Sequence, residues 1–344
     1  MCIRDRYDRF TGGRRVLKSV GIVGLGIYAP EKVMTNADWE KLVDTSDEWI
    51  RTRTGIQERR YVTEGQGTSD LATEAAKKAL EDAGMVPEDV EFIILATCTP
   101  DYRAQNASSL VQAKLGAKNA AAFDLSAACS GFIYALSIGK SMIQSGMYKN
   151  ILVIAAESVS KLLNMKDRNT AILFGDGAAA AVLKEVEDGY GIISSFLGTE
   201  GVLDETLRIN YGGTLHPVTH EAIDNGDIYL KMNGQEVFKF AVKALPKSTK
   251  EALAAGNINV EDLDMVIPHQ ANMRIIEAAA KRLKLPMDKF YVNLQKYGNT
   301  SAASVGLALG EAVQEGKIKK GDLLALTGFG AGLTYGSVVI KWAK

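Results

Sequence analysis

Two stretches of this 344-residue chain repeat each other. Residues 77–95 read KKALEDAGMVPEDVEFIIL and residues 250–268 read KEALAAGNINVEDLDMVIP, without a gap and at a constant offset of 173. Farther along, the same order of strand, Gly- and Ser-rich turn, small-residue helix and strand is expected over 120–156 and over 289–327. Self-similarity of this kind indicates an internal duplication. We therefore expect two copies of one α/β unit, packed as a pseudo-symmetric pair whose matching turns face one site.

The hydrophobic pattern of the chain alternates between that of strands and that of helices. Expected strands cover 20–28, 91–97, 120–125, 151–156, 263–267, 290–294, 322–327 and 334–342, and expected helices cover 68–83, 108–115, 131–145, 239–255, 273–283 and 302–315. Such alternation predicts a layered α/β protein with largely buried sheets. We place the two halves at residues 19–190 and 191–344. Residues 1–18, with five arginines and no apolar periodicity, are interpreted as a disordered arm or the product of a misplaced start codon.

Composition narrows the class of protein. The chain is 47% hydrophobic and 24% charged, which is typical of a globular protein and excludes disorder or a coiled coil. Lys and Arg number 40 against 41 Asp and Glu, so the net charge gives no reason to expect nucleic-acid binding. No apolar run is long enough to span a bilayer. Cys2, Cys98 and Cys129 have no paired spacing, which favours a reducing compartment such as the cytoplasm and predicts no disulfide framework or zinc cluster.

Cys129 is the first candidate for chemistry. It follows a predicted strand and opens a predicted helix within DLSAACSGF, residues 124–132. The unpaired N–H groups and the positive end of the dipole at a helix N-terminus favour a thiolate. A thiolate here is a nucleophile for acyl transfer. A buried structural cysteine is an equally good interpretation of this turn taken alone.

His269 and Asn299 occupy turns that the duplication would bring to the same site. His269 follows an apolar strand within VIPHQAN (266–272), at the strand end where α/β sheets carry their sites. Asn299, in YGNTSAA (297–303), lies within about a residue of the position that corresponds to Cys129. Taken singly, the first is more often a core or capping histidine and the second an ordinary helix cap. Together, a cysteine and two neutral hydrogen-bond donors suit a reaction that passes through a thioester and an enolate.

Three further patterns are weaker. Gly24-Leu-Gly26 follows a strand but lacks the rest of a dinucleotide-binding unit. His216 and His220, in HPVTH, have no further ligand in the sequence, so no metal site is predicted. The segment 48–53, EWIRTR, is either a solvated surface or the mouth of a site for a phosphate-bearing ligand.

The chain resembles β-ketoacyl-[acyl carrier protein] synthase III, of the thiolase-like condensing enzymes, over residues 18–344. The stretches that carry the resemblance are TSDEWIRTRTGIQERR (45–60), DLSAACSGF (124–132), DRNTAILFGDGAA (167–179), VIPHQAN (266–272), YGNTSAAS (297–304) and GFGAGLTYGS (328–337). The elongating synthases have a second histidine where this chain has Asn299, and thiolases need a cysteine after Cys129, which is absent. The resemblance implies a thiolase-like fold with layers in the order α-β-α-β-α.

The resemblance also implies a mechanism. Cys129 would take an acyl group from a short acyl-CoA, malonyl-acyl carrier protein would enter, and His269 and Asn299 would assist its decarboxylation to a carbanion that attacks the acyl-cysteine. The product would be a β-ketoacyl-carrier protein that primes fatty acid biosynthesis. The backbone N–H groups of Cys129 and Ala331 would hold the oxyanion.

Partners and binding residues are likewise implied by the resemblance. Trp49, Arg53, Arg168 and Asn272 would bind the coenzyme A and its pantetheine arm. A basic patch of Lys239, Arg274, Lys281 and Arg282 would meet the acidic carrier protein, where complementary charge speeds encounter. The family forms homodimers, and no metal, redox cofactor, nucleic acid or membrane insertion is implied.

Two departures from the family pattern bear on activity. Where the family has FGGG, this chain has Phe329-Gly330-Ala331-Gly332, and Ala331 would be strained if its position needed a positive φ. Where the family often has an aromatic-Pro pair, this chain has Ala104-Gln105, which predicts room for a longer or branched acyl group.

Other functions stay open on the sequence. One is a different Cys-His-Asn condensing enzyme with another acyl donor or with malonyl-CoA; hydroxymethylglutaryl-CoA synthase would also need a catalytic Glu that no motif assigns. The others are an inactive acyl-binding scaffold and a papain-like cysteine hydrolase, whose local sequence around the cysteine is absent. The preferred acyl chain and the pathway are not determined by the sequence.

Overall fold

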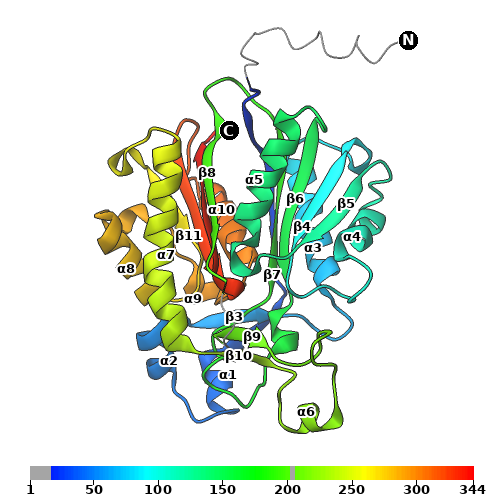
Figure 1. Cartoon of the computed structure of the whole chain (residues 1–344), viewed down its shortest axis with the longest axis vertical. Coiled ribbons are helices and arrows are strands. Elements are labelled where there is room, and N and C mark those ends of the chain that lie inside the picture. The colour runs from blue at the N-terminus through cyan, green and yellow to red at the C-terminus, as the bar shows by residue number, and fades with distance from the viewer. Residues whose placement is uncertain (1–16, 202–205) are drawn as a thin grey trace.

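The computed structural model describes residues 17–201 and 206–344. Residues 1–16, most of the N-terminal segment interpreted above, therefore lie outside the described residues. Two sheets form the framework (Figure 1). The first has the order β1-β7-β6-β4-β5, and its strands are β1 Val20–Tyr28, β4 Phe92–Ala96, β5 Ala121–Leu125, β6 Asn150–Glu157 and β7 Gly177–Glu185. The second has the order β8-β13-β12-β11, and its strands are β8 Gly191–Thr199, β11 Met265–Pro268, β12 Leu323–Gly330 and β13 Thr334–Lys341.

The two sheets share one topology. In the first sheet β1 pairs antiparallel with β7, and β7 pairs antiparallel with β6. In the second sheet β8 pairs antiparallel with β13, and β13 pairs antiparallel with β12. β4 and β11 then continue in parallel with β6 and β12. Beyond β11, Phe290 forms a single parallel bridge to Val266 in the place that β5 occupies in the first sheet. The expected duplication is therefore present in the three-dimensional structure.

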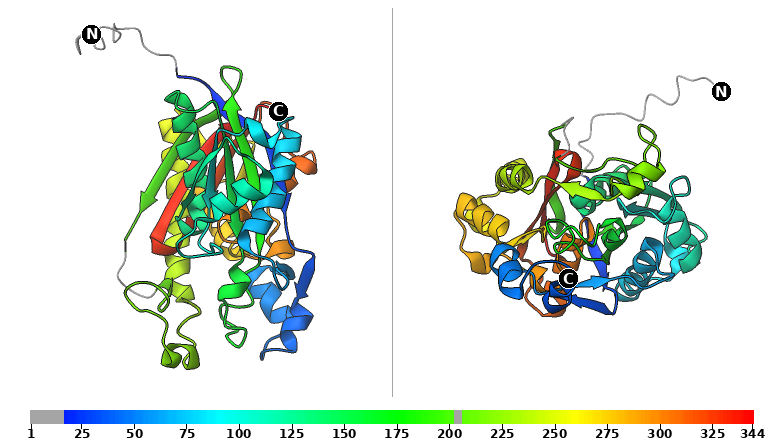
Figure 2. Two further views of the ribbon diagram at one scale, coloured as in Figure 1. Left: turned by 90° about the vertical axis from the view of Figure 1, so that its right-hand side faces the viewer. Right: turned by 90° about the horizontal axis from the view of Figure 1, so that it is seen from below.

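Helices complete the layers in the order α-β-α-β-α (Figures 1 and 2). The major helices are α3 Thr68–Asp82, α4 Ala107–Leu115, α5 Gly131–Gln144, α7 Gly234–Ala255, α8 Met273–Leu283 and α10 Ala303–Gln314. α3 and α4 cover the outer face of the first sheet and α7 that of the second, with α8 packed against α7. α5 and α10 lie between the sheets, where Phe132, Leu136, Val305 and Leu326 belong to one apolar cluster. Burial of this cluster from both sides holds the halves together.

The repeat extends to backbone detail. Gly84 ends the first copy of the repeated helix with a φ of 62°, and Asn257, 173 residues later, has a φ of 54°. The short 3-10 turns Pro87–Asp89 and Val260–Asp262 follow at the same offset. In each, the third residue's carboxylate accepts a hydrogen bond from the backbone N–H three residues earlier. Corresponding positions of the two copies have thus kept the same local structure.

Smaller elements form a lobe at the end of the molecule remote from the C-terminus (Figures 1 and 2). They are β2 Lys32–Thr35, α1 Asn36–Glu40, α2 Asp47–Thr54, β3 Glu58–Tyr61, β9 Leu207–Ile209, α6 His220–Asp224, β10 Leu230–Met232 and α9 Leu294–Tyr297. The hydrophobic pattern predicted neither the helices and strands of this lobe nor β7 and β8.

Most predicted elements agree with the structure to within a few residues, with one exception. The predicted strand 290–294 is wrong, because only Phe290 forms a bridge and α9 begins at Leu294. Gly24 and Gly26, weighed as a dinucleotide motif, lie where an added Cβ would collide with the backbone of α3 at Ala79 and Ala75. These two glycines let β1 approach the helix closely. The division into halves at 190/191 stays a prediction.

Candidate active site

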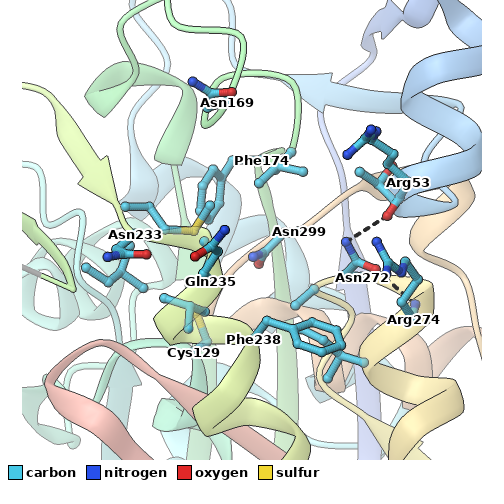
Figure 3. Close-up of a pocket in the computed structure, with 18 of the residues that line it drawn as sticks. Arg53, Cys129, Asn169, Phe174, Asn233, Gln235, Phe238, Asn272, Arg274 and Asn299 are labelled. Carbon is cyan, nitrogen blue, oxygen red and sulfur yellow. Dashed lines mark hydrogen bonds between the residues drawn. The ribbon is translucent and has the colours of Figure 1, made fainter.

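One cavity of about 1150 Å³ brings the predicted catalytic residues together. Figure 3 labels two of them, Cys129 and Asn299. Cys129, His269 and Asn299 all line it, and they come from the turns after β5, after β11 and before α10. Five of the predicted binding residues line it as well: Trp49, Arg53, Lys239, Asn272 and Arg274. The two copies of the unit therefore contribute to one site, because both present the same ends of their strands to it.

Cys129 lies in a tight turn that leads directly into α5. The preceding residue, Ala128, has a φ of 48°, a left-handed conformation that is costly for alanine. Ser301 has a φ of 49° at the matching position of the second copy. Gly330 at the end of β12 lies so close that a Cβ there would be 2.5 Å from the backbone nitrogen of Cys129. The cysteine turn is thus held in a strained geometry by the strand beside it.

The thiol of Cys129 is protonated in the free protein at neutral pH. Burial raises the pKa of Cys129 to about 12, the hydroxyl of Ser301 opposes that shift, and the negative charge of Glu157 adds to it. Burial of the sulfur therefore acts against the thiolate that the helix N-terminus favours.

His269 is a neutral hydrogen-bond donor. Burial lowers the pKa of His269 to about 3, and the ring packs edge to face with Phe329 at 5.2 Å. Its Nδ1 lies 2.6 Å from the hydroxyl of Ser304, which also accepts a weak bond from the backbone N–H of Gln270. The Ser304 hydroxyl can donate to Nδ1 or accept from it, depending on the tautomer of the ring. In the tautomer in which Ser304 donates, the imidazole carries its own proton on Nε2.

Asn299 is held as a second neutral donor. Its Oδ1 accepts the backbone N–H of Ser301 at 2.9 Å, so its NH2 group is the part left for a ligand. The backbone of Asn299 is clamped on both sides, since its N–H donates to Leu173 and its carbonyl accepts from Gly175. This pairing with the 173–175 loop sets the direction of the amide toward the cavity.

The mouth of the cavity carries an aromatic ring between two arginines. The guanidinium of Arg53 lies 4.9 Å and that of Arg168 lies 5.2 Å from the centre of the Trp49 ring. Asn272 donates a hydrogen bond to the backbone carbonyl of Arg53 at 3.1 Å, which ties α8 to α2 (Figure 3). Cations over an aromatic face form a surface suited to a phosphorylated purine.

Four predicted residues lie outside the lining of the cavity: Arg168, Lys281, Arg282 and Ala331. Lys281 and Arg282 are exposed in the last turn of α8, the helix that Arg274 opens at the cavity mouth. Ala331 does not have the positive φ that would strain it; in this loop Gly332 and Leu333 do, with φ of 68° and 48°. The backbone strain that a positive φ would cause at Ala331 is therefore absent.

Sequence reasoning missed several residues around the site. Glu157 ends β6 and is fully buried, Ser301 contacts Cys129 and Ser304 contacts His269. A carboxylate at the end of an otherwise apolar strand was a signal for the first. Both serines lie in the YGNTSAAS stretch, but nothing in their spacing assigned them partners.

Comparison with known proteins assigns the family. Two family models described as 3-oxoacyl-[acyl-carrier-protein (ACP)] synthase III match residues 123–201 and, for its C-terminal part, 253–342. A β-ketoacyl-[acyl-carrier-protein] synthase III of Fusobacterium nucleatum is 58% identical over 95% of this chain and 100% of its own length. The chain belongs to the β-ketoacyl-[acyl-carrier-protein] synthase III family. The family resemblance stated from the sequence is confirmed.

Further relatives agree with that assignment. The synthase III of Caldanaerobacter subterraneus is also 58% identical, over 95% of this chain and 98% of its own. The crystal structure of 3-oxoacyl-[acyl-carrier-protein] synthase III from Aquifex aeolicus superposes with a TM-score of 0.87 at 49% identity, covering 94% of this chain and all of that one. The fold is thus thiolase-like and the protein an acyltransferase of the condensing type, as predicted.

Metal-binding clusters and membrane-spanning helices are both absent from the described residues. Within 17–201 and 206–344, no three His, Cys, Asp or Glu side chains gather in a way that could hold a metal ion. In the same part of the chain, no helix combines the length and the apolar character needed to cross a membrane.

Proposed function

We propose that the enzyme condenses a short acyl-CoA with malonyl-acyl carrier protein, through an acyl-Cys129 intermediate, as the priming step of fatty acid biosynthesis. The observation that carries the proposal is the meeting of Cys129, His269 and Asn299 in one cavity. Each comes with a defined protonation or orientation, so each has a distinct role. The reaction has two stages that share the site.

In the first stage Cys129 attacks the thioester carbonyl of the acyl-CoA. A bond forms between its sulfur and the acyl carbon, and the bond to the coenzyme A sulfur breaks. The oxyanion of the tetrahedral intermediate accepts hydrogen bonds from the backbone N–H groups of Cys129 and Ala331. The missing side chain of Gly330 supports this assignment, because it leaves the N–H of Cys129 accessible beside the loop.

In the second stage the malonyl thioester loses CO2, and negative charge develops on its carbonyl oxygen. His269, through Nε2–H, and Asn299, through its NH2 group, donate to that oxygen. Both donors are neutral and preoriented, so they stabilise the charge as it forms without first having to reorganise. The resulting carbanion attacks the acyl carbon, and the bond to Cys129 breaks.

The binding residues follow from the same scheme. Trp49, Arg53 and Arg168 hold the adenosine phosphate end of coenzyme A, and Asn272 lines the path of the pantetheine arm. Their support is the stacked arrangement of the two arginines on the indole. A cationic patch on α7 and α8 receives the acidic carrier protein; it consists of Lys239, Arg274, Lys281 and Arg282. All four residues are exposed; Lys239 and Arg274 line the cavity, and Lys281 and Arg282 lie in the last turn of α8.

We also propose that the enzyme is a cytoplasmic homodimer that uses no metal or redox cofactor. β5 supports the dimer, because it is an edge strand: among the described residues it pairs with β4 alone. Phe123 and Leu125 on this strand are only partly buried, as expected of a strand that continues a sheet in a second copy. Sedimentation of the purified protein would distinguish a dimer from a monomer.

The decisive experiment mixes the purified protein with acetyl-CoA and malonyl-acyl carrier protein and analyses both proteins by mass spectrometry. We expect an acetyl group on Cys129 and acetoacetyl-carrier protein as product. Both should be lost in Cys129→Ala and kept in the matched control Cys98→Ala. Acetylation without a condensation product would instead favour another acceptor, with malonyl-CoA as the first to test. If Cys129 stayed unmodified, a panel of longer acyl-CoAs would test the donor.

A further inference from the structure

Behind Cys129 lies a buried carboxylate, Glu157, that the mechanism above does not use. Its side chain is 0% exposed at the end of β6. It accepts hydrogen bonds from the hydroxyls of Thr97, Thr99 and Ser301 and from the backbone N–H of Cys98. No salt bridge to it is found among the described residues. Burial raises the pKa of Glu157, and the hydrogen bonds from these neutral donors act against that shift.

The link from Glu157 to the nucleophile is a continuous chain of hydrogen bonds. The thiol of Cys129 donates to the hydroxyl oxygen of Ser301 at 3.4 Å. The hydroxyl of Ser301 donates to Oε1 of Glu157 at 3.1 Å. Every donor in this chain points toward the carboxylate. The contact draws together three segments far apart in the sequence, and the left-handed backbone of Ser301 is part of the geometry that places its hydroxyl between them.

The thiol needs a proton acceptor, and the nearest alternative is unsuited to the task. Because the Cys129 sulfur carries its proton in the resting site, attack on a thioester must be accompanied by proton loss. Burial lowers the pKa of His269 to about 3, which makes its imidazole a poor proton acceptor. It is therefore arranged to donate rather than to accept.

Resting on the proposed function, we propose that Glu157 is a positioning residue that takes up the Cys129 proton through Ser301 during enzyme acylation. As the bond between sulfur and acyl carbon forms, the thiol proton passes to Ser301 Oγ, and the Ser301 proton passes to Glu157 Oε1. Coenzyme A leaves as a thiolate and takes its proton from water. The acyl-enzyme then contains a neutral thioester beside a neutral carboxylic acid, so no charge is left buried.

The same proton returns in the second stage. When the malonyl-derived carbanion attacks, the acyl-sulfur bond breaks and Cys129 is released as a thiolate. Glu157 gives its proton to Ser301, which gives its own to the sulfur, and the resting thiol is restored. The titratable groups that face Glu157 are Cys98, next to β4, and Cys129; the charge of the carboxylate acts on both thiols.

The test measures acetylation of Cys129 in a single turnover of the full chain, by rapid quench and mass spectrometry over a range of pH. Glu157→Gln keeps the size of the side chain but cannot accept the proton. Ser301→Ala breaks the chain and leaves the backbone N–H that holds Asn299. The control is Glu311→Gln, the same change at a buried acid that contacts Lys296, Asn293 and Tyr297 instead.

We expect acetylation to slow about 100-fold or more in Glu157→Gln and in Ser301→Ala, the usual size of a general-base effect, and to be unchanged in Glu311→Gln. In the wild type the rate should rise with the ionisation of Glu157 and then level off. In Glu157→Gln this rise should be absent, and the acetylation rate should instead increase about tenfold per pH unit toward the high pKa of the thiol. Decarboxylation of malonyl-carrier protein by the unacylated enzyme should change only a few-fold, which a collapsed site would not allow.

Two outcomes would overturn the proposal while leaving the proposed function intact. One is wild-type acetylation with a wild-type pH profile in Glu157→Gln. The other is equal loss of acetylation and of decarboxylation in both variants, which would mean a purely structural role. If the wild type itself formed neither acetyl-Cys129 nor the condensation product, the proposed function would be at fault instead.

Discussion

Replacing Gly330 by alanine should disable the site without unfolding the protein. A Cβ at this position would lie 2.5 Å from the backbone nitrogen of Cys129 and 2.8 Å from the Cβ of Ala128, whereas ordinary contact begins at 3.4 Å. The atoms that would have to yield are backbone, in a turn already strained at Ala128. The cysteine turn must therefore move away from β12 by about 0.9 Å, the difference between the observed and the ordinary distance to nitrogen.

A shift of this size has a predictable kinetic cost. A displacement of about 1 Å in a reacting group costs about 100-fold in rate, which corresponds to about 2.7 kcal/mol in the barrier. We expect kcat/KM for acetoacetyl-carrier protein formation to fall by about that factor in Gly330→Ala. Both stages depend on Cys129, so the acetylation rate should fall as well.

The control is Gly213→Ala, in an exposed loop where an added Cβ meets nothing within 4 Å and φ is unremarkable. It should keep wild-type activity. Thermal unfolding of both variants shows whether the chain is still folded. Wild-type kcat/KM in a folded Gly330→Ala protein would refute the reasoning, since the cysteine turn would then tolerate displacement from the strand.

Three further predictions concern other parts of the site. Because burial lowers the pKa of His269 from 6.5 to about 3, the unfolded chain binds a proton there that the folded chain does not, so this group lowers stability as the pH falls below about 6.5. Between about pH 6 and about pH 5, the free energy of unfolding of His269→Gln in urea should therefore fall by about 1 kcal/mol less than that of the wild type; equal slopes would contradict the assignment. Arg168→Ala should raise KM for acetyl-CoA severalfold with little change in kcat, because one of two cations on Trp49 is removed. Steady-state kinetics measures both constants, and a fall in kcat at unchanged KM would contradict the prediction. Lys281→Glu with Arg282→Glu should slow capture of malonyl-carrier protein most at low salt and leave acetylation by acetyl-CoA unchanged, and an effect that is independent of salt would argue against a docking surface.

Strand β7 of the first sheet shows why the hydrophobic pattern fails to predict some strands. β7 begins Gly-Ala-Ala-Ala-Ala, and Ala178 to Ala181 are all fully buried. Alanine is a poor strand former in isolation, so the pattern gave no strand signal. The small side chains are needed because α3 and α10 cover the two faces of this strand, and a Cβ on Gly306 of α10 would collide with Ala179. Only the packed helices make this composition suitable for a strand.

The duplication, the alternation of helices and strands, and the three residues Cys129, His269 and Asn299 could all be inferred from the amino-acid sequence alone. They are local properties: a repeat at fixed offset, periodic apolar positions, and polar residues at strand ends. The protonation state of the site residues cannot be inferred from such local properties. Whether Cys129 is thiol or thiolate depends on how completely neighbouring segments exclude water from the sulfur, which no local pattern reports.

The amino-acid sequence by itself therefore determined the two-unit construction and the family of chemistry. The tertiary structure decided that burial keeps His269 neutral and that Glu157 lies two hydrogen bonds from Cys129. Both depend on contacts between residues far apart along the chain. Such contacts have no signature in sequence spacing, because they exist only once burial has brought the two halves together.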